Sequence, residues 1–383
     1  MAAKPDKGER LHPNRTSDAV STFAQELRAR IVGQEEAIQE IVRSFAVLTS
    51  GLRDTERPLL TLLFMGPTGV GKTETVKVIA DTLFGRRNAF TRVNAQEFSS
   101  PHQVAKLLGA PPGYVGNEIE PMLSQKNIDR HHKEAFEEKR GIFRKGSGRV
   151  QKLFPLDPAH YLSLVLFDEI EKADPTLWNS LLGILDDGNL TLGNNEHTDF
   201  TRSILILTSN VGSAQIAKTL RGSMGFHADS HDELNRQVAD EALRAAKEVF
   251  PYEFLNRFDS ILFFRTLGSA DLHRILDLYL WDLHARAVRS ETPFILDCSD
   301  PVRSWLVKQG SDPEFGARPL RRAFAKNVVH PLSNLLSSGQ VRPGDLVRAA
   351  LHGGHVTFAR ETRTDRGIVV PRPQRKRAAR GGA

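Results

Sequence analysis

Four short runs of nearly continuous apolar residues stand out in the first part of the chain. They are PLLTLLF (58–64), LSLVLF (162–167), SILILT (203–208) and SILFF (260–264). Such runs are typical of strands buried on both faces of a sheet, because side chains on either side then meet other side chains. A weaker run, AFTRV (89–93), predicts a fifth strand. Helical patterns lie between the runs, so the chain predicts an α/β fold with a parallel sheet flanked by helices.

Start and stop signals divide the rest of the chain. A helical pattern covers about residues 22–48, with an interruption at 31–34, and Asp174-Pro175 and Gly188 predict the start and end of another helix. After about Thr266 the strand signals stop, and amphipathic helical stretches follow, with one further sheet signal at HVTFA (355–359). The predicted organisation is a leader (1–20), a large α/β domain (21–265), a smaller, mainly helical C-terminal domain (266–360) and a basic tail (361–383).

Composition favours a soluble protein of the cytoplasm. The chain has 383 residues, of which 40% are hydrophobic and 26% charged, as in ordinary globular proteins. No apolar run approaches the roughly 20 residues of a membrane span, and the charged N-terminus does not have the pattern of a secretory signal. Cys298 is the only cysteine, which favours a reducing compartment. The tail carries seven basic and two acidic residues, so it supplies most of the net charge of +6.

The first predicted strand leads into a phosphate-binding loop. Residues 66–73, Gly66-Pro67-Thr68-Gly69-Val70-Gly71-Lys72-Thr73, match the full G-x-x-x-x-G-K-[ST] pattern and are followed by a helical stretch. Triphosphate is densely anionic, and only a glycine-rich turn lets several backbone N–H groups approach it. We expect Lys72 to reach the β- and γ-phosphates and the Thr73 hydroxyl to ligate Mg²⁺. ATP and Mg²⁺ are therefore the predicted cofactors.

A pair of carboxylates follows the second long apolar run. Asp168 and Glu169 end this predicted strand, so they should lie at the carboxyl edge of the sheet, where the phosphate loop also begins. Asp168 is the expected partner of the Mg²⁺ shell, and Glu169 is the expected base that orients the attacking water.

Together with several other motifs, these residues resemble the AAA+ ATPases of the Clp/heat-shock-100 class. The resemblance is greatest to the second ATPase module of the double-ring Clp unfoldases and covers roughly residues 25–360. It rests further on IVGQ (31–34), GAPPGYVG (109–116), ILTSNVG (206–212), FLNRFD (254–259) and FGARPLRR (315–322). It implies an AAA+ large domain followed by a small lid domain.

The resemblance also implies roles for individual residues. Ile31 and Val32 would lie against adenine, and Asn210 would hydrogen-bond water or the γ-phosphate. Arg257 would project into the site of a neighbouring subunit as an arginine finger, and Arg318 would reach the phosphates from the small domain. Fixed cations are what transition-state charge on the γ-phosphate requires.

The glycine-flanked Tyr114 fits a channel role that the family implies. In this family the GYVG loop lines the axial channel of a hexameric ring, so Tyr114 and Val115 would grip an extended polypeptide. A bulky aromatic ring on a flexible, glycine-flanked loop can contact a polypeptide of any sequence. We expect a second channel loop at 186–200. The long stretch from Gly116 to the next strand exceeds the family pattern and predicts an insert over about 117–160. We expect its charged part (126–154), with a solvated His131-His132 pair, to decorate the channel entrance and bias substrate choice.

Met224-Gly225-Phe226 follows the Asn210 motif at the place where protease-linked relatives carry a docking tripeptide. The tripeptide could dock a Clp-type peptidase partner or belong to a packed loop, and the sequence leaves both alternatives open.

The leading functional hypothesis is an ATP-dependent protein unfoldase or translocase that acts as a homo-oligomeric ring, expected to be a hexamer, on unfolded or tagged proteins. The alternative is an AAA+ ATPase that remodels nucleic acid or a nucleoprotein complex, suggested by the basic tail and insert. Nucleic-acid motors need basic channel loops, and GYVG contains no Lys or Arg, which favours polypeptide. A nucleotide-gated scaffold without hydrolysis is disfavoured because the expected catalytic residues are all present.

Overall fold

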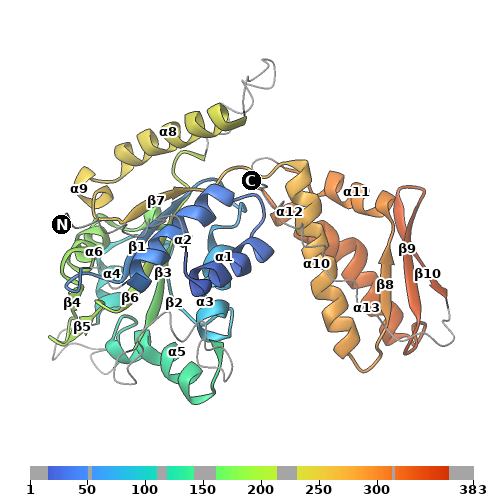
Figure 1. Cartoon of the computed structure of the whole chain (residues 1–383), viewed down its shortest axis with the longest axis horizontal. Helices are drawn as coiled ribbons and strands as arrows, with labels where there is room; N and C mark the ends of the chain where they lie inside the picture. The colour runs from blue at the N-terminus through green and yellow to red at the C-terminus, as the bar shows by residue number, and fades with distance from the viewer. Residues whose placement is uncertain are drawn as a thin grey trace, which may run out of the picture.

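The structure, a computed structural model, describes residues 16–50, 54–109, 119–141, 161–213, 231–312 and 315–361. The larger part of the molecule is an α/β layer structure, and the smaller part begins with a long helix at Ser269 (Figure 1). Most of the predicted leader and nearly all of the predicted tail lie outside the described residues. Within the described ranges, no helix has both the length and the apolar character needed to cross a membrane.

A five-stranded sheet forms the centre of the larger part. Its strand order is β2-β3-β6-β1-β7, and every neighbouring pair is parallel. The strands are β1 (Leu60–Met65), β2 (Thr91–Asn94), β3 (Ser163–Asp168), β6 (Ser203–Ser209) and β7 (Ser260–Phe263). Each of the five predicted strands is therefore confirmed. Since all run in the same direction, their carboxyl ends share one edge of the sheet and their amino ends share the other.

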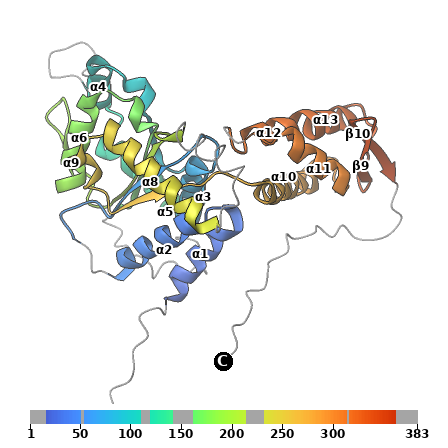
Figure 2. The ribbon, with the colours of Figure 1, turned by 90° about the horizontal axis from the view of Figure 1, so that it is seen from above.

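Both faces of this sheet are buried, which explains the continuous apolar runs. Leu62 and Phe64 of β1 face one core cluster, while Leu63 and Met65 face the other, as the period of two along a strand requires. The first cluster includes residues of α1, α2 and α3, and the second includes residues of α4, α6, α8 and α9. Figure 2 shows α1 and α2 on the side of the molecule opposite α4, α6 and α9. The predicted parallel sheet between helical layers is confirmed.

The helices of the larger part also follow local signals. They are α1 (Asp18–Arg30), α2 (Glu35–Ser50), α3 (Lys72–Phe84), α4 (Pro101–Leu108), α5 (Gln125–Glu137), α6 (Pro175–Asp187), α8 (His231–Val249) and α9 (Tyr252–Leu255), with the 3-10 turns η1 (Ala95–Phe98) and η3 (Ile170–Lys172). The predicted interruption at 31–34 separates α1 from α2. Asp174 caps α6 by accepting a hydrogen bond from the Thr176 N–H, and Gly188 ends it in the left-handed conformation, as predicted.

The smaller part combines helices with a sheet of its own. It contains α10 (Ser269–Arg289), β8 (Ile295–Cys298), α11 (Asp300–Gln309), α12 (Arg318–Phe324), the π-helical turn η4 (Ala325–Val329), α13 (His330–Ser337), β9 (Leu346–His352) and β10 (His355–Glu361). The sheet order is β10-β9-β8. The sequence pattern predicted only β10. It missed β8 and β9 because they alternate between buried and exposed positions and so contain no continuous apolar run.

The beginning of the predicted insert is core structure. In α5, which covers residues 125–137, His132 is 2% exposed, and its Nδ1 accepts a hydrogen bond from the Leu162 N–H at 2.8 Å. Asp129, one turn earlier, accepts a hydrogen bond from the Ser163 hydroxyl. The expectation of a solvated histidine pair is therefore wrong for His132, because α5 packs beside the start of β3. Residues 142–160 of the predicted insert lie outside the described residues.

The predicted second channel loop contains a short hairpin of β4 (Asn189–Thr191) and β5 (His197–Asp199). The hairpin packs on the large part, since the Thr198 hydroxyl donates to the Leu123 carbonyl at 2.8 Å and the Gly193 N–H to the Leu108 carbonyl at 2.9 Å. Its role in a channel stays a prediction.

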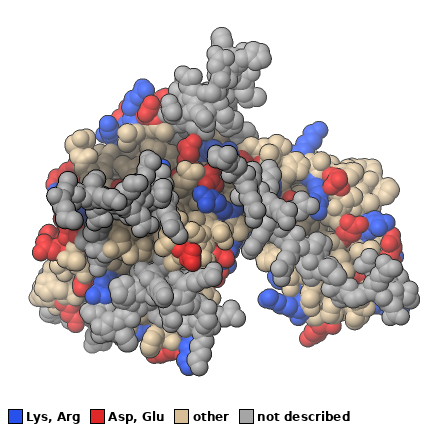
Figure 3. Space-filling view, viewed as in Figure 1, with Lys and Arg blue, Asp and Glu red and all other residues tan. Residues whose placement is uncertain are grey.

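The two parts meet beside the carboxyl edge of the large sheet. The Ala317 N–H of the smaller part donates to the Gly69 carbonyl of the phosphate loop at 3.0 Å. In the space-filling view, charged side chains of both signs gather near this junction, and a hollow separates the two parts below it (Figure 3). The phosphate loop is thus one of the places where the smaller part touches the larger one.

Candidate nucleotide site

The phosphate loop connects β1 to α3 and needs its glycines. Gly66, Gly69 and Gly71 all have positive φ angles, of 138°, 78° and 115°. A Cβ atom on Gly66 would collide with the Phe264 carbonyl, and one on Gly69 would collide with the Phe315 carbonyl. The loop is therefore enclosed by the end of β7 on one side and by the smaller part on the other, and a side chain at either position would force them away.

Lys72 is the first residue of α3 and is buried. Its ammonium group donates to the carbonyls of Gly66 at 2.5 Å and Pro67 at 2.8 Å, and to Oδ1 of Asn210 at 2.8 Å. Burial lowers the pKa of Lys72 from 10.5 to about 8, and the neighbouring positive charge of Arg318 acts in the same direction. The structure thus brings together three of the predicted site residues, Lys72, Asn210 and Arg318, that come from distant parts of the chain.

The two predicted metal ligands also lie side by side. The Thr73 hydroxyl is 3.5 Å from Oδ1 of Asp168, at the end of β3. Asp168 further accepts hydrogen bonds from the Thr208 hydroxyl and from the Arg92 guanidinium, each at 2.5 Å. A hydroxyl and a carboxylate next to a phosphate loop fit a hydrated Mg²⁺ ion, which prefers oxygen ligands and keeps several waters.

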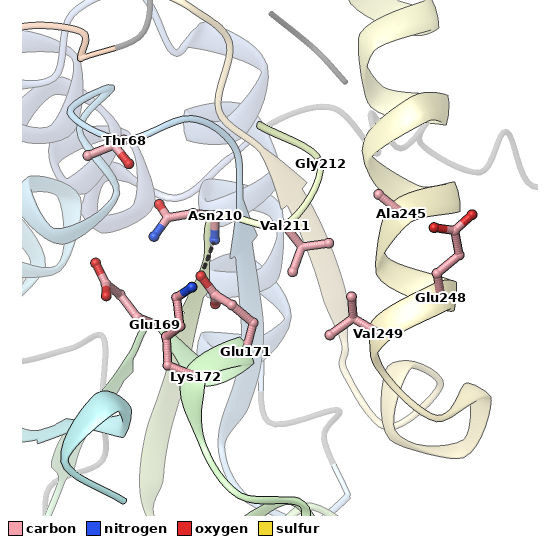
Figure 4. A pocket seen from close by; sticks show the side chains of 10 residues that line it. All are labelled: Thr68, Glu169, Glu171, Lys172, Asn210, Val211, Gly212, Ala245, Glu248 and Val249. Atoms are coloured by element: carbon pink, nitrogen blue, oxygen red, sulfur yellow. Dashed lines mark hydrogen bonds between the residues drawn. The ribbon is translucent and has the colours of Figure 1, made fainter. Parts of the chain in front are cut away.

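Glu169 has a strained backbone. Its φ and ψ angles of 59° and 50° lie in the left-handed region, which is uncommon for a residue other than glycine. The Glu169 N–H donates to the Thr208 hydroxyl at 3.0 Å, which holds this conformation. The side chain lines an open pocket next to the phosphate loop (Figure 4). Such strain is found where a functional group must be held in one direction.

The pocket has a volume of about 600 Å³. It is lined by Thr68, Glu169, Glu171, Lys172, Asn210, Val211, Gly212, Ala245, Glu248 and Val249 (Figure 4). Thr68, Glu169 and Asn210 were predicted site residues, and the sequence analysis missed Glu171 and Lys172. Glu171 Oε1 accepts the Asn210 N–H at 3.0 Å, while its buried Oε2 has no partner among the described residues. The signal for Glu171 was the third acid in the segment DEIE (168–171).

Arg318 stands at the start of α12, directly after the residues that touch the phosphate loop. A Cβ atom on Gly69 would lie 3.4 Å from Cγ of Arg318, and Arg318 is close enough to Lys72 to affect its pKa. It therefore lies beside the phosphate loop, and its contact with the phosphates stays a prediction.

Arg257 lies at the opposite edge of the sheet. It precedes β7, and its carbonyl accepts a hydrogen bond from Arg57, just before β1, at 2.7 Å. Its guanidinium pairs with Asp186 at 2.9 Å and Glu253 at 3.1 Å and is 37% exposed. Since β1 has six residues, at about 3.3 Å per residue the two edges are roughly 20 Å apart. Arg257 cannot reach the phosphate loop of its own chain.

Ile31 and Val32, the predicted adenine neighbours, are buried at the junction of α1 and α2. They are close in sequence to Gln34, whose side chain donates to the Val70 carbonyl of the phosphate loop at 3.1 Å. Tyr114 and Val115, like Met224-Gly225-Phe226, lie outside the described residues, so their predicted roles stay predictions.

The family comparisons agree with this geometry. The model described as AAA domain (Cdc48 subfamily) matches residues 57–134 and 156–261 and leaves 135–155 unmatched. The model described as the C-terminal, D2-small domain of ClpB protein matches residues 267–349. The chain belongs to the AAA family and carries a small domain of the ClpB type.

Relatives narrow the group further. The chain is 40% identical over 326 residues to the chloroplastic chaperone protein ClpD of Arabidopsis thaliana, covering 85% of this chain and 31% of that one. It is 36% identical over 332 residues to the chaperone protein ClpB of Bdellovibrio bacteriovorus, covering 87% and 34%. A reconstruction of Hsp104 with ATPγS and FITC-casein matches with a TM-score of 0.67 and 27% identity, covering 89% and 51%. The chain is homologous to the second ATPase module of these proteins and spans about a third of the length of the two curated relatives.

Proposed function

We propose that this chain binds and hydrolyses ATP with Mg²⁺ and uses the energy to unfold polypeptides and move them through the channel of a homo-oligomeric ring. The observation that carries the proposal is the position of the charged and polar groups. Lys72, Asp168, Glu169 and Asn210 gather at the carboxyl edge of the sheet, while Arg257 stands at the amino edge.

The residues at the carboxyl edge divide the chemistry among them. Lys72 and Arg318 supply positive charge to the phosphates, and Asn210 fixes the Lys72 ammonium and hydrogen-bonds the terminal phosphate or the water. Thr73 and Asp168 hold Mg²⁺, which when bound neutralises charge on the phosphate oxygens. Glu169, held in its strained conformation, accepts the proton of the attacking water.

A second copy completes the site. Since Arg257 is about one strand length from its own phosphate loop, the arginine that stabilises transition-state charge must come from a neighbour. This requirement supports a ring, and we propose a hexamer of identical copies.

The substrate class follows from the resemblance and from the relatives. The two curated relatives are named as chaperone proteins, and the matched Hsp104 structure contains casein. We propose unfolded or tagged polypeptides as substrates, gripped by Tyr114 and Val115, and a cytoplasmic location. A peptidase partner that binds Met224-Gly225-Phe226 is a finer hypothesis, which a pull-down with a Phe226→Ala control tests.

The test compares two ligands and two variants. Casein should stimulate ATP hydrolysis by the wild-type chain, and single-stranded DNA should not. The Tyr114→Ala variant should keep basal ATP turnover and lose the unfolding of a substrate protein. Stimulation by DNA and not by casein would instead favour the nucleic-acid alternative. Sizing of the Glu169→Gln variant with ATP, which this variant should retain, tests whether rings form.

A further inference from the structure

The side chain of Gln34 joins the phosphate loop to residues 265–268, which form the linker between the two parts. Gln34 is 3% exposed and precedes α2. Its Nε2 donates to the Val70 carbonyl at 3.1 Å and to the Arg265 carbonyl at 2.9 Å, while its Oε1 accepts the Arg265 N–H at 3.0 Å. A neutral amide has two donors and an acceptor on one planar group, and all three are used here.

The two hydrogen-bond partners of Gln34, Val70 and Arg265, belong to different segments of the chain. Val70 belongs to the phosphate loop, whereas Arg265 is two residues after the end of β7, where the chain leaves the large sheet. Four residues after Arg265, α10 begins the smaller part. One side chain therefore fixes the distance between the loop that surrounds phosphate and the first residue of the linker.

The connection continues into α10 through Asp271. The Arg265 guanidinium pairs with Asp271 at 2.9 Å, and the same carboxylate accepts the Gly268 N–H at 3.1 Å, in the first turn of α10. Gly33, next to Gln34, lies against this carboxylate, because a Cβ atom there would be only 2.9 Å from Asp271 Cγ. Gln34 thus holds the first residue of the linker, and Gly33 packs against the carboxylate that accepts the N–H of its last residue, Gly268.

The phosphate loop touches the smaller part a second time, at the neighbouring residue. The Gly69 carbonyl accepts the Ala317 N–H at 3.0 Å, and Gly316 packs against the same loop, with no room for a Cβ atom beside the Gly69 carbonyl. A shift of the loop at residues 69–70 therefore changes contacts at two separate points of the smaller part, α10 through Gln34 and α12 through Ala317.

We propose that Gln34 is a positioning residue that couples nucleotide occupancy of the phosphate loop to the orientation of the smaller part. Coupling requires that both sites bias the same element, and the residues Gln34, Arg265 and Asp271 are that element. The proposal rests on the proposed binding of nucleotide at this loop. Leu in place of Gln34 fills a similar volume without any of the three hydrogen bonds, whereas Glu keeps an acceptor and loses both donors.

The test measures hydrogen exchange and ATPγS affinity of the full chain. In the wild type, ATPγS should slow exchange in the phosphate loop and also at residues 266–272 and 317–323. In Gln34→Leu, protection of the loop should remain, while protection at 266–272 is lost. ATPγS affinity should fall about tenfold, because all three hydrogen bonds of the Gln34 amide are missing. Gln34→Glu should resemble Gln34→Leu. Gln39→Leu is the matched control, because Gln39 is an exposed glutamine of α2.

Two further comparisons keep the outcome decisive. Asp271→Asn preserves an acceptor for Gly268 but weakens the Arg265 ion pair, so it should reproduce the lost protection, and it replaces Gln34→Leu if that variant does not fold. The double variant Gln34→Leu/Asp271→Asn should lose no more protection at 266–272 and no more ATPγS affinity than Gln34→Leu alone, as expected for residues in one network. Wild-type protection at 266–272 in both Gln34→Leu and Asp271→Asn overturns the proposal. A wild-type chain that does not bind ATPγS overturns the proposed function instead.

Discussion

The two edges of the five-stranded sheet are built from the same strands and yet differ in every local respect. At the carboxyl edge, glycines and Glu169 adopt left-handed backbone conformations, and the Lys72 ammonium is buried among carbonyls. At the amino edge, backbone and side chains are paired with each other. The strained backbone of Glu169 and the buried Lys72 ammonium thus lie at one edge, and reciprocal backbone and side-chain hydrogen bonds join the strands at the other.

The amino edge is held by reciprocal hydrogen bonds. The Thr61 N–H donates to Asp259 at 2.7 Å, and the Asp259 N–H donates to the Thr61 hydroxyl at 3.0 Å. Arg57 joins the end of α6 to this edge by donating to the Leu185 and Arg257 carbonyls. If Arg257 acts on a neighbouring copy, as proposed, the difference teaches that such a residue stands on a fully hydrogen-bonded backbone, whereas the proposed catalytic residue Glu169 stands on a strained one.

Arg257→Ala, at the amino edge, should have the largest effect: it should lower ATP hydrolysis strongly and change nucleotide affinity little. If this arginine acts on a neighbouring copy, ATP hydrolysis should fall about 10³-fold, while nucleotide affinity changes by about twofold or less, since the chain's own phosphate loop is untouched. Steady-state hydrolysis and a fluorescent ADP titration measure the two quantities. Arg286→Ala is the control, because Arg286 also pairs with an acid four residues away on an exposed helix. Equal losses of affinity and hydrolysis would contradict the assignment.

Lys72→Met, at the carboxyl edge, should instead lower nucleotide affinity directly. The loss of a charged donor to the phosphates should weaken nucleotide binding about 100-fold. Thermal stability without nucleotide should stay the same or rise, because a buried ammonium group is costly to desolvate. Lys77→Met, on the same helix, should leave both quantities near wild type. The prediction is wrong if Lys72→Met binds nucleotide as the wild type does.

Asp259→Ala tests the amino edge by itself. It leaves the Thr61 N–H without its carboxylate partner, which should lower the free energy of unfolding by about 2 kcal/mol, measured by denaturant titration. Nucleotide affinity of the folded variant should be unchanged. Asp282→Ala, at an exposed position of α10, should change stability by less than about 0.5 kcal/mol. A loss of affinity larger than the loss of stability would show that the two edges are not independent.

The smallest predicted effect is a pH dependence at the amino edge. Burial lowers the pKa of His132 from 6.5 to about 4, so the unfolded chain binds more protons than the folded one between these values, and stability should fall as the pH is lowered from 6.5 to 4. Burial raises the pKa of the neighbouring Asp129, which acts in the opposite direction.

The His132→Gln variant separates the two groups, because Gln can accept the Leu162 N–H without titrating. The melting temperature of the wild type should fall more steeply below pH 6.5 than that of His132→Gln. Parallel curves for the two proteins would refute a role for His132 in this pH range.

Much of the larger part could be predicted from the sequence, because a strand buried on both faces and a phosphate loop each have strong local patterns. Lys72, Asp168 and Asn210 follow such patterns directly. Gln34 stood in the recognised motif IVGQ but without its contacts, and Glu171 was missed, because the contacts of both residues depend on Val70, Arg265 and Asn210, which are distant in sequence. β8 and β9 were missed because a sheet buried on one face has a weaker pattern, and His132 was missed because its charge-rich neighbours hid a buried helix face.

The separation of Arg257 from its own phosphate loop has a consequence for assembly. If each copy inserts Arg257 from its amino edge into the nucleotide site at the carboxyl edge of the next copy, the contact is heterologous. Such contacts produce closed rings or open helical filaments. A two-fold dimer is the geometry least suited to it. Every copy in a ring would then have a direction, and an inactive copy would impair one particular neighbour and spare the one on its other side.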